Sequence, residues 1–128
     1  MTQEEKQLLL KDLCSRLSYG IKFTLSDDSI YTMKGIDLIV TDEGDWEYAV
    51  AAKGIEPIEI EYVKPYLRPM SSMTKKEKKE IYASFSPTGQ ELFSLPYVDW
   101  LNAHHFDYHG LIEKGVALEA KEGMYKTE

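Results

Sequence analysis

The period of the hydrophobic pattern changes twice along this chain, and these changes constrain its fold more than any other feature. Apolar residues recur with helical spacing over residues 1–20, alternate with polar residues over 21–63, and return to helical spacing after residue 75. Helical spacing places apolar side chains on one face of a helix, whereas alternation places them on one face of a strand. The sequence therefore predicts an α+β fold with its strands in the first half.

The length of 128 residues and an apolar content of 43% are typical of one folded domain with a single core. We therefore expect a single domain over residues 1–128. Its predicted parts are a helix over 1–20, an antiparallel β meander over 21–63, a Pro-containing connector over 64–74, helices over 75–115 and a tail over 116–128.

The first helix has a clear start signal and an apolar stripe. Thr2 and Glu5 have the spacing of a capping box. The apolar residues that follow at helical spacing are Leu10, Leu13, Cys14 and Leu17. This stripe predicts that Cys14 is a buried core residue. Because Cys14 is the only cysteine, an intrachain disulfide and a cysteine-based zinc site are both excluded.

Four short alternating segments follow, joined by turn residues such as Asp27-Asp28. Gly35 interrupts one of them, which indicates a bulge or a sharp bend. Strands of this length and spacing predict a four-stranded antiparallel meander. Short, strongly bent strands often curl into a barrel, so a small SH3-like barrel is also expected.

The second half begins with Pro65 and Pro69, which predict an end to regular structure. Thr74 and Glu77 repeat the capping-box spacing and predict the start of a second helix.

Further breaks divide the remainder of the second half. Pro87 and Gly89 are expected to end the second helix, and Pro96 suits the first turn of a third. Asp107 is expected to cap a short fourth helix that Gly115 ends.

Charge is unevenly distributed in this acidic chain, whose net charge is -7. Residues 64–79 form its only basic stretch, with six lysines and arginines against one glutamate. An acidic balance disfavours general nucleic-acid binding, which depends on neutralising phosphates. We therefore expect a protein partner, with nucleic-acid binding through the basic stretch as the alternative. The predicted binding residues are Lys64, Tyr66, Arg68, Lys75, Lys76 and Lys79.

The pattern supplies no set of catalytic residues. There is no GxSxG nucleophile motif and no Gly-rich phosphate loop. The one cluster of metal-ligand types is His104, His105, Asp107 and His109. It lacks an HExxH pattern, and the expected cap at Asp107 would place His105 and His109 on different elements. We therefore expect no enzyme activity and no cofactor, with a metal-dependent hydrolase using His105 and His109 as a second alternative.

The N-terminus has no basic region followed by an apolar segment, so no secretory signal is expected. No apolar run approaches the ~18 residues that a membrane span requires. The expected location is the cytoplasm.

Three segments carry a resemblance to a known family. They are KDLCSRLSYGIKF, VKPYLRPMSSMTKKEKKE and DWLNAHHFDYHGLIEKGVALEAKEGMY. Together they resemble an uncharacterised family of small prophage-type proteins of gut anaerobic bacteria. The resemblance covers nearly the whole chain and is weakest between Thr24 and Ile58. The family pattern has a basic residue, usually Arg, where this chain has His109, which argues against a metal ligand there. The resemblance implies a phage or mobile-element accessory protein and implies no activity.

Overall fold

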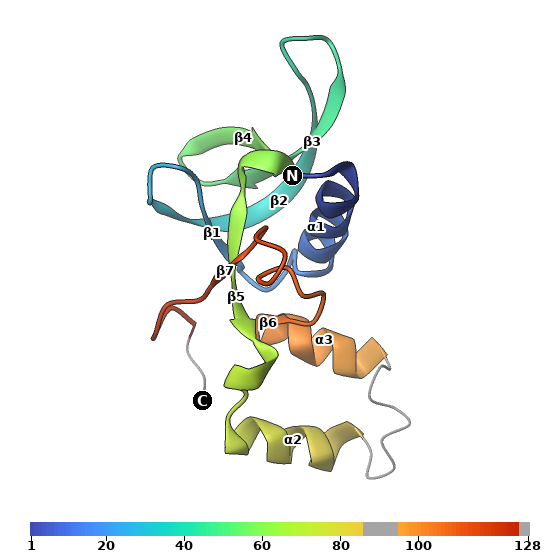
Figure 1. Ribbon diagram of the computed structural model, residues 1–128, viewed down its shortest axis with the longest axis vertical. Coiled ribbons are helices and arrows are strands. Elements are labelled where there is room, and N and C mark those ends of the chain that lie inside the picture. Colours follow the sequence, from blue (N-terminus) through green and yellow to red (C-terminus); the bar gives the residue numbers. More distant parts are fainter. Residues whose placement is uncertain (86–94, 126–128) are drawn as a thin grey trace.

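The computed structural model describes the backbone of residues 1–85 and 95–125 and the side chains of residues 1–81 and 97–125. Within them, three α-helices and a seven-stranded sheet form an α+β fold, which confirms the predicted class (Figure 1). The helices are α1 (Gln3–Ser15), α2 (Lys75–Phe85) and α3 (Leu95–Ala103). The strands are β1 (Lys22–Thr24), β2 (Ile30–Val40), β3 (Trp46–Ala52), β4 (Ile55–Glu59), β5 (Lys64–Pro69), β6 (Phe106–Asp107) and β7 (Leu118–Glu119). Two short 3-10 turns flank β5, namely η1 (Ile60–Tyr62) and η2 (Met70–Ser72).

The sheet is open and mixed in the described part of the chain. Its strand order is β4-β3-β2-β1-β5-β6, and β7 also pairs with β5. Strands β1 to β5 pair in antiparallel fashion, whereas β6 and β7 run parallel to β5. The predicted bulge is present, because the β2–β3 register shifts between Met33 and Gly35. The sheet therefore exceeds the expected four-stranded meander, and the expected SH3-like barrel is not confirmed.

Strand β5 occupies part of the predicted connector. Pro65 and Pro69 lie within this strand instead of ending regular structure. Its two parallel neighbours pair with only two residues each, and the strand ends at Pro69. Proline has no N–H to donate to a neighbouring strand. Because these neighbours each pair with so few residues of β5, few such hydrogen bonds are needed, and the sheet tolerates both prolines. The backbone N–H of Arg68 donates to the carbonyl of His105 at 2.8 Å.

Helix α1 begins as predicted, but it is rotated from its predicted orientation. The capping box is formed: the Thr2 N–H donates to the Glu5 carboxylate at 2.9 Å, and the Glu5 N–H donates to the Thr2 hydroxyl at 3.0 Å. The residues that face the core are Leu9, Asp12, Leu13 and Arg16. The prediction that Cys14 is buried is therefore wrong, because the buried face lies one residue earlier along the helix.

The exposed position of Cys14 leads to a prediction about its reactivity. We expect its thiol to react with a maleimide or a disulfide reagent in the folded protein, without denaturant, because access limits the rate of such reactions. Mass spectrometry after labelling in native buffer measures this, with labelling in concentrated urea as the reference. A thiol that reacts only in urea would contradict the position of α1.

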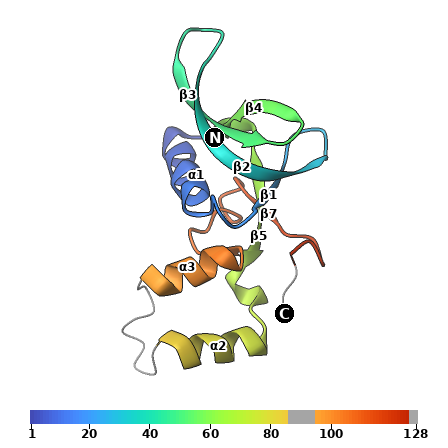
Figure 2. The ribbon, with the colours of Figure 1, turned by 180° about the vertical axis from the view of Figure 1, so that it is seen from behind.

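The core has two clusters. The main one joins α1, the central strands and the segment after β6; its buried members are Leu9, Leu13, Ile21, Phe23, Met33, Val50, Ile60, Val63, Leu67, Leu111, Val116 and Ala117. The smaller one joins α2, α3 and β6, with Ile81, Tyr97, Leu101 and Phe106 buried. Helices α2 and α3, which contribute to the second cluster, lie at the opposite end of the molecule from the β2–β3 hairpin (Figures 1 and 2).

After β6, residues 108–115 contain a turn over 111–115 and no helix, so the expected fourth helix is wrong. Asp107 still acts as a cap, because its carboxylate accepts from the N–H groups of Leu111 and Ile112, both at 2.9 Å. The following residues add β7 to the sheet instead of forming only a tail. The expected break at Pro87 and Gly89 lies outside the described residues.

Among the helices of the described residues, none combines the length and the apolar character that crossing a membrane requires.

Candidate functional site

An extended apolar surface is exposed on one face of the β2–β3 hairpin. We call the four residues that form it the hairpin patch: Leu38 (54% exposed), Val40 (53%), Trp46 (66%) and Tyr48 (48%). The strand register places Leu38 opposite Tyr48 and Val40 opposite Trp46. Because side chains two apart along a strand share a face, these two cross-strand pairs form one continuous surface.

The hairpin patch continues a face that is buried further down the same strands. Ile36 pairs with Val50 on this face, and Val50 is fully buried in the main core. Of the eleven residues of β2, residues 30–32 pair with β1, whereas residues 33–40 pair with β3 and extend beyond β1. The end of the hairpin therefore stands out from the body (Figure 1), and its apolar face leaves the core.

The turn of the hairpin is well defined. The Thr41 N–H donates to the Asp45 carbonyl at 2.8 Å, and the Asp45 N–H donates to the Thr41 hydroxyl at 3.2 Å. Gly44 has a φ of 87°, in the left-handed region that favours glycine. These contacts fix the backbone of the turn that carries Asp42, Glu43 and Asp45.

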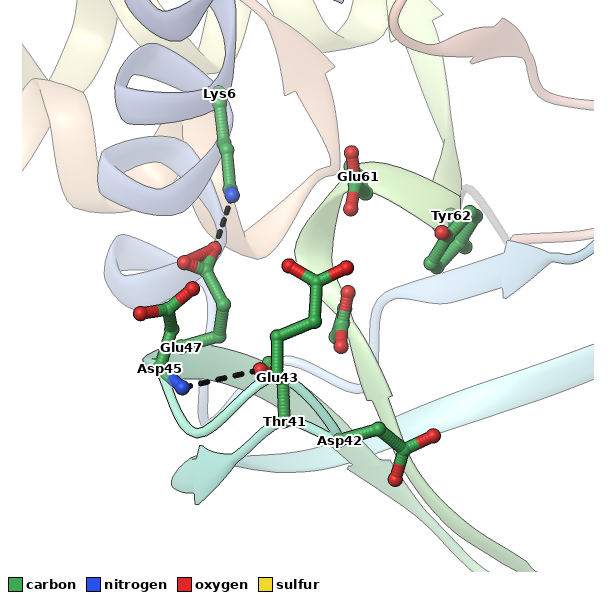
Figure 3. A pocket seen from close by; sticks show the side chains of 9 residues that line it. Lys6, Thr41, Asp42, Glu43, Asp45, Glu47, Glu61 and Tyr62 are labelled. Carbon is green, nitrogen blue, oxygen red and sulfur yellow. Dashed lines mark hydrogen bonds and ion pairs between the residues drawn. The ribbon is translucent and has the colours of Figure 1, made fainter.

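An acidic pocket of about 360 Å³ lies beside the turn. Its lining combines the turn, β3, the end of β4, η1 and one residue of α1: Lys6, Thr41, Asp42, Glu43, Asp45, Glu47, Glu59, Glu61 and Tyr62. Figure 3 shows Lys6 in contact with Glu47, while Glu43 and Glu61 point into the shared space and Asp42 points away. Six carboxylates and one lysine give the pocket a strongly negative potential.

Two groups in the acidic pocket have shifted pKa values. The hydrogen bond to Glu47 raises the pKa of the Lys6 ammonium. Partial desolvation, together with the neighbouring Glu61 carboxylate, raises the pKa of Glu59. The neighbouring carboxylates contribute to both shifts, because negative charge favours a bound proton or cation.

A buried ionic network connects α1 with the segment after α3. Arg16 is fully buried and binds Asp12 through Nε (2.7 Å) and Nη2 (3.0 Å), and Nη2 also donates to the Phe106 carbonyl at 2.6 Å. The Nδ1 atom of His109 lies 2.7 Å from the Asp12 carboxylate. Burial alone would raise the pKa of Asp12, but hydrogen bonds from His109 and Arg16 outweigh it and lower this pKa.

The Asp12–His109 contact has the orientation that a general base requires, since it leaves the second ring nitrogen of His109 free of the carboxylate. Among the side chains that the structure describes, no hydroxyl or thiol group makes a hydrogen bond to His109. The contacts of Asp12 with Arg16 and His109 join α1 to the segment after α3.

A second ionic pair anchors α2. Arg68 binds both carboxylate oxygens of Glu77, at 2.8 and 2.7 Å, and lies 4.1 Å from the centre of the Phe106 ring. Burial would raise the pKa of Glu77, but Arg68 and the N–H of Thr74 lower it to about 2. The predicted capping box of α2 is present in the same contacts, at 2.9 and 3.1 Å.

The structure divides the predicted binding residues into two groups. Tyr66 and Arg68 are buried, and Arg68 is committed to Glu77, so neither side chain is free to contact a partner. Four lysines remain exposed, and three of them lie together on α2: Lys64, Lys75, Lys76 and Lys79. The basic surface is therefore smaller than the sequence predicted and lacks its aromatic and arginine members.

The predicted metal alternative gains no support from the positions of the histidines. His109 binds Asp12 and Tyr108 lies against its ring, whereas His105 stacks on Tyr125 with ring centres 3.8 Å apart. Burial and the charge of Arg16 lower the pKa of His105 to about 4. In the described residues, no group of three or more His, Cys, Asp or Glu side chains is placed to hold a metal ion.

The chain matches no protein-family model, and no curated protein and no solved structure shows significant similarity to it.

Neither the hairpin patch nor the acidic pocket was predicted from the sequence. The apolar residues of the patch were visible as alternation, but alternation does not reveal which end of a strand leaves the core. The available signal was length: the strand over residues 30–40 has 11 residues, against 3 in β1 and 7 in β3.

Proposed function

We propose that this chain is a non-catalytic protein-interaction module that contacts its partner through the hairpin patch. The exposure of Leu38, Val40, Trp46 and Tyr48 on one face carries the proposal. Contiguous apolar surface that stays in water is unfavourable, and such surface on a folded protein is typical of an interaction site. The setting in a phage or mobile element is part of the same proposal and depends on the sequence resemblance.

The composition of the hairpin patch suits a protein interface. Trp and Tyr are enriched among the residues that dominate binding energy, because they bury a large area at low entropic cost. Trp46 and Tyr48 lie next to each other on one strand face, within reach of the same partner side chain.

The test compares co-purification of partners by the untagged protein and by two variants. In Trp46→Thr/Tyr48→Thr the patch loses its aromatic rings, and threonine keeps the preference for a strand. We expect a stoichiometric partner protein with the wild type, and a loss of affinity of at least ~30-fold in the variant, the effect of removing one hot-spot residue.

The matched control is Leu17→Thr, which changes a residue that is 41% exposed and lies outside the hairpin. It is expected to retain the partner. Circular dichroism establishes that both variants fold. Equal recovery of every partner by the wild type and the patch variant would show that the hairpin patch is not the contact surface.

Nucleic-acid binding is the second candidate, and the exposed lysines on α2 favour it. It predicts an affinity that falls steeply with salt, because bound phosphates release counterions. A high 260/280 nm absorbance ratio that nuclease treatment removes, without any protein partner, would favour this candidate. The variant Lys75→Ser/Lys76→Ser/Lys79→Ser would then reduce the salt slope, whereas the patch variant would leave it unchanged.

A further inference from the structure

The hairpin patch does not stand alone, because it adjoins the acidic pocket. A groove of about 280 Å³ between α1 and β3 is lined by Gln3, Lys6, Gln7, Leu10, Trp46, Glu47, Tyr48 and Ile60. This groove shares Lys6 and Glu47 with the acidic pocket. A groove that includes the apolar side chains of Leu10, Trp46 and Ile60 thus adjoins the acidic pocket.

We infer that the partner segment is cationic and amphipathic, with apolar side chains for the hairpin patch and groove and a Lys or Arg side chain for the acidic pocket. This inference rests on the proposed function and names the chemistry of the partner. It follows from charge complementarity: the surface offers an apolar contact area whose rim carries six carboxylates.

Charge also decides between the possible occupants. Lys6 is paired with Glu47, so the remaining carboxylates that line the acidic pocket lie together without a paired cation among the residues of its lining and repel one another. A partner Lys or Arg would relieve this repulsion. In a symmetric dimer that joined two hairpin patches, two acidic pockets would come together at the interface, which like-charge repulsion disfavours. A nucleic acid would meet the same repulsion from its phosphates.

The remaining alternative occupant is a second copy of this chain, bound head to tail. The exposed lysines of α2 lie at the opposite end of the molecule from the hairpin (Figures 1 and 2), so such contacts would form an open chain of molecules. The described surface of α2 offers charge but no exposed apolar side chain for the hairpin patch. A separate amphipathic segment fits both halves of the surface.

The test uses short fluorescein-labelled peptides that share the same Leu and Trp positions. The other positions carry Ser and Lys, Ser alone, or Ser and Glu, and anisotropy gives the dissociation constants for the full chain. At low salt we expect the Lys peptide to bind about tenfold more tightly than the Ser peptide, and the Glu peptide to bind most weakly. The advantage of the Lys peptide should shrink at ~1 M salt, where charges are screened within about 3 Å.

Two pairs of substitutions locate the charge effect. Glu59→Gln/Glu61→Gln removes two carboxylates from the acidic pocket and should abolish most of the advantage of the Lys peptide. The control Glu113→Gln/Glu122→Gln removes the same charge from exposed positions that do not line this pocket, and should retain that advantage.

The outcomes separate this inference from the proposed function. If all three peptides bind equally and Trp46→Thr/Tyr48→Thr weakens them all, the patch is a contact site but the cationic partner is wrong. If the Lys peptide fails to bind, or binds the patch variant as well as the wild type, both the proposed contact surface and the cationic partner are wrong. Self-association that Lys75→Ser/Lys76→Ser/Lys79→Ser abolishes would assign the surface to a second copy and overturn the cationic segment.

Discussion

Replacing Asp12 with alanine is expected to lower the free energy of unfolding by about 3–5 kcal/mol, the cost of leaving a buried charge without its partner. Arg16 has no exposed surface, and Asp12 is its only anionic contact among the described side chains. The substitution also removes the contact of His109 with α1. Urea unfolding followed by circular dichroism measures the change.

Two further variants show whether the effect comes from the unpaired charge. Glu4→Ala removes an exposed carboxylate from the same helix and should change stability by no more than about 0.5 kcal/mol. Asp12→Leu/Arg16→Met removes both charges and should recover much of the stability that Asp12→Ala loses, because apolar residues of similar volume often replace a buried pair at little cost. A double variant less stable than Asp12→Ala would mean that this ion pair is itself strongly stabilising.

Acid is expected to destabilise the protein from about pH 6.5 downward, well above the range in which carboxylates titrate. The pKa of His105 is about 4 in the folded state and 6.5 in the unfolded chain. Between these pH values only the unfolded state gains a proton, so stability falls with pH until the folded state is protonated as well. The partly exposed position of His105 reduces the effect, and we expect a loss of ~2 kcal/mol.

The titration of Glu77 extends the loss of folding stability to lower pH. Its folded pKa of about 2 lies below the unfolded value of 4.5, so its pair with Arg68 stabilises the fold above pH 4.5. That contribution is lost as the pH falls from 4.5 towards 2, because the unfolded state binds the proton first. Urea midpoints at pH 7, 5 and 3 measure both steps.

The variant His105→Asn isolates the first step. His105 has a φ of 65°, and asparagine tolerates this left-handed conformation better than most residues. Because the stack on Tyr125 is removed, the variant should be less stable than the wild type at every pH. Its stability should, however, no longer fall between pH 6.5 and pH 4. An unchanged decline in His105→Asn would show that another group causes it.

Local signals predicted the first helix well and its orientation poorly. The capping box of Thr2 and Glu5 forms as its spacing indicates. The apolar stripe gave the wrong face, because Asp12 and Arg16 occupy positions that a hydrophobic pattern assigns to solvent. A charged pair one turn apart stays buried only when distant residues supply its remaining hydrogen bonds. Here these residues are Phe106 and His109, and a local sequence pattern contains no information about them.

The sheet and the candidate site also show that a local sequence pattern does not reveal contacts with distant residues. Alternation located β1, β2 and β3, but the fourth alternating segment, over residues 58–62, overlaps β4 at only two residues and continues into η1. Strands β6 and β7 contain two residues each, too few for any period to be recognised. The basic composition of residues 64–79 was evident, yet the burial of Arg68 depends on Glu77 and the Phe106 ring. Composition indicates which charges a chain carries, and only the packing decides which of them face solvent.

The link between Arg16 and the Phe106 carbonyl spans 90 positions of the sequence, and the link between Asp12 and His109 spans 97. During synthesis on the ribosome, α1 would emerge long before the residues that satisfy its buried charges. Until then, burying Arg16 against the sheet is costly, so the nascent helix has no stable docking position. Stable docking of α1 would therefore wait until residues 106–109 have been synthesised, and these long loop closures would slow folding.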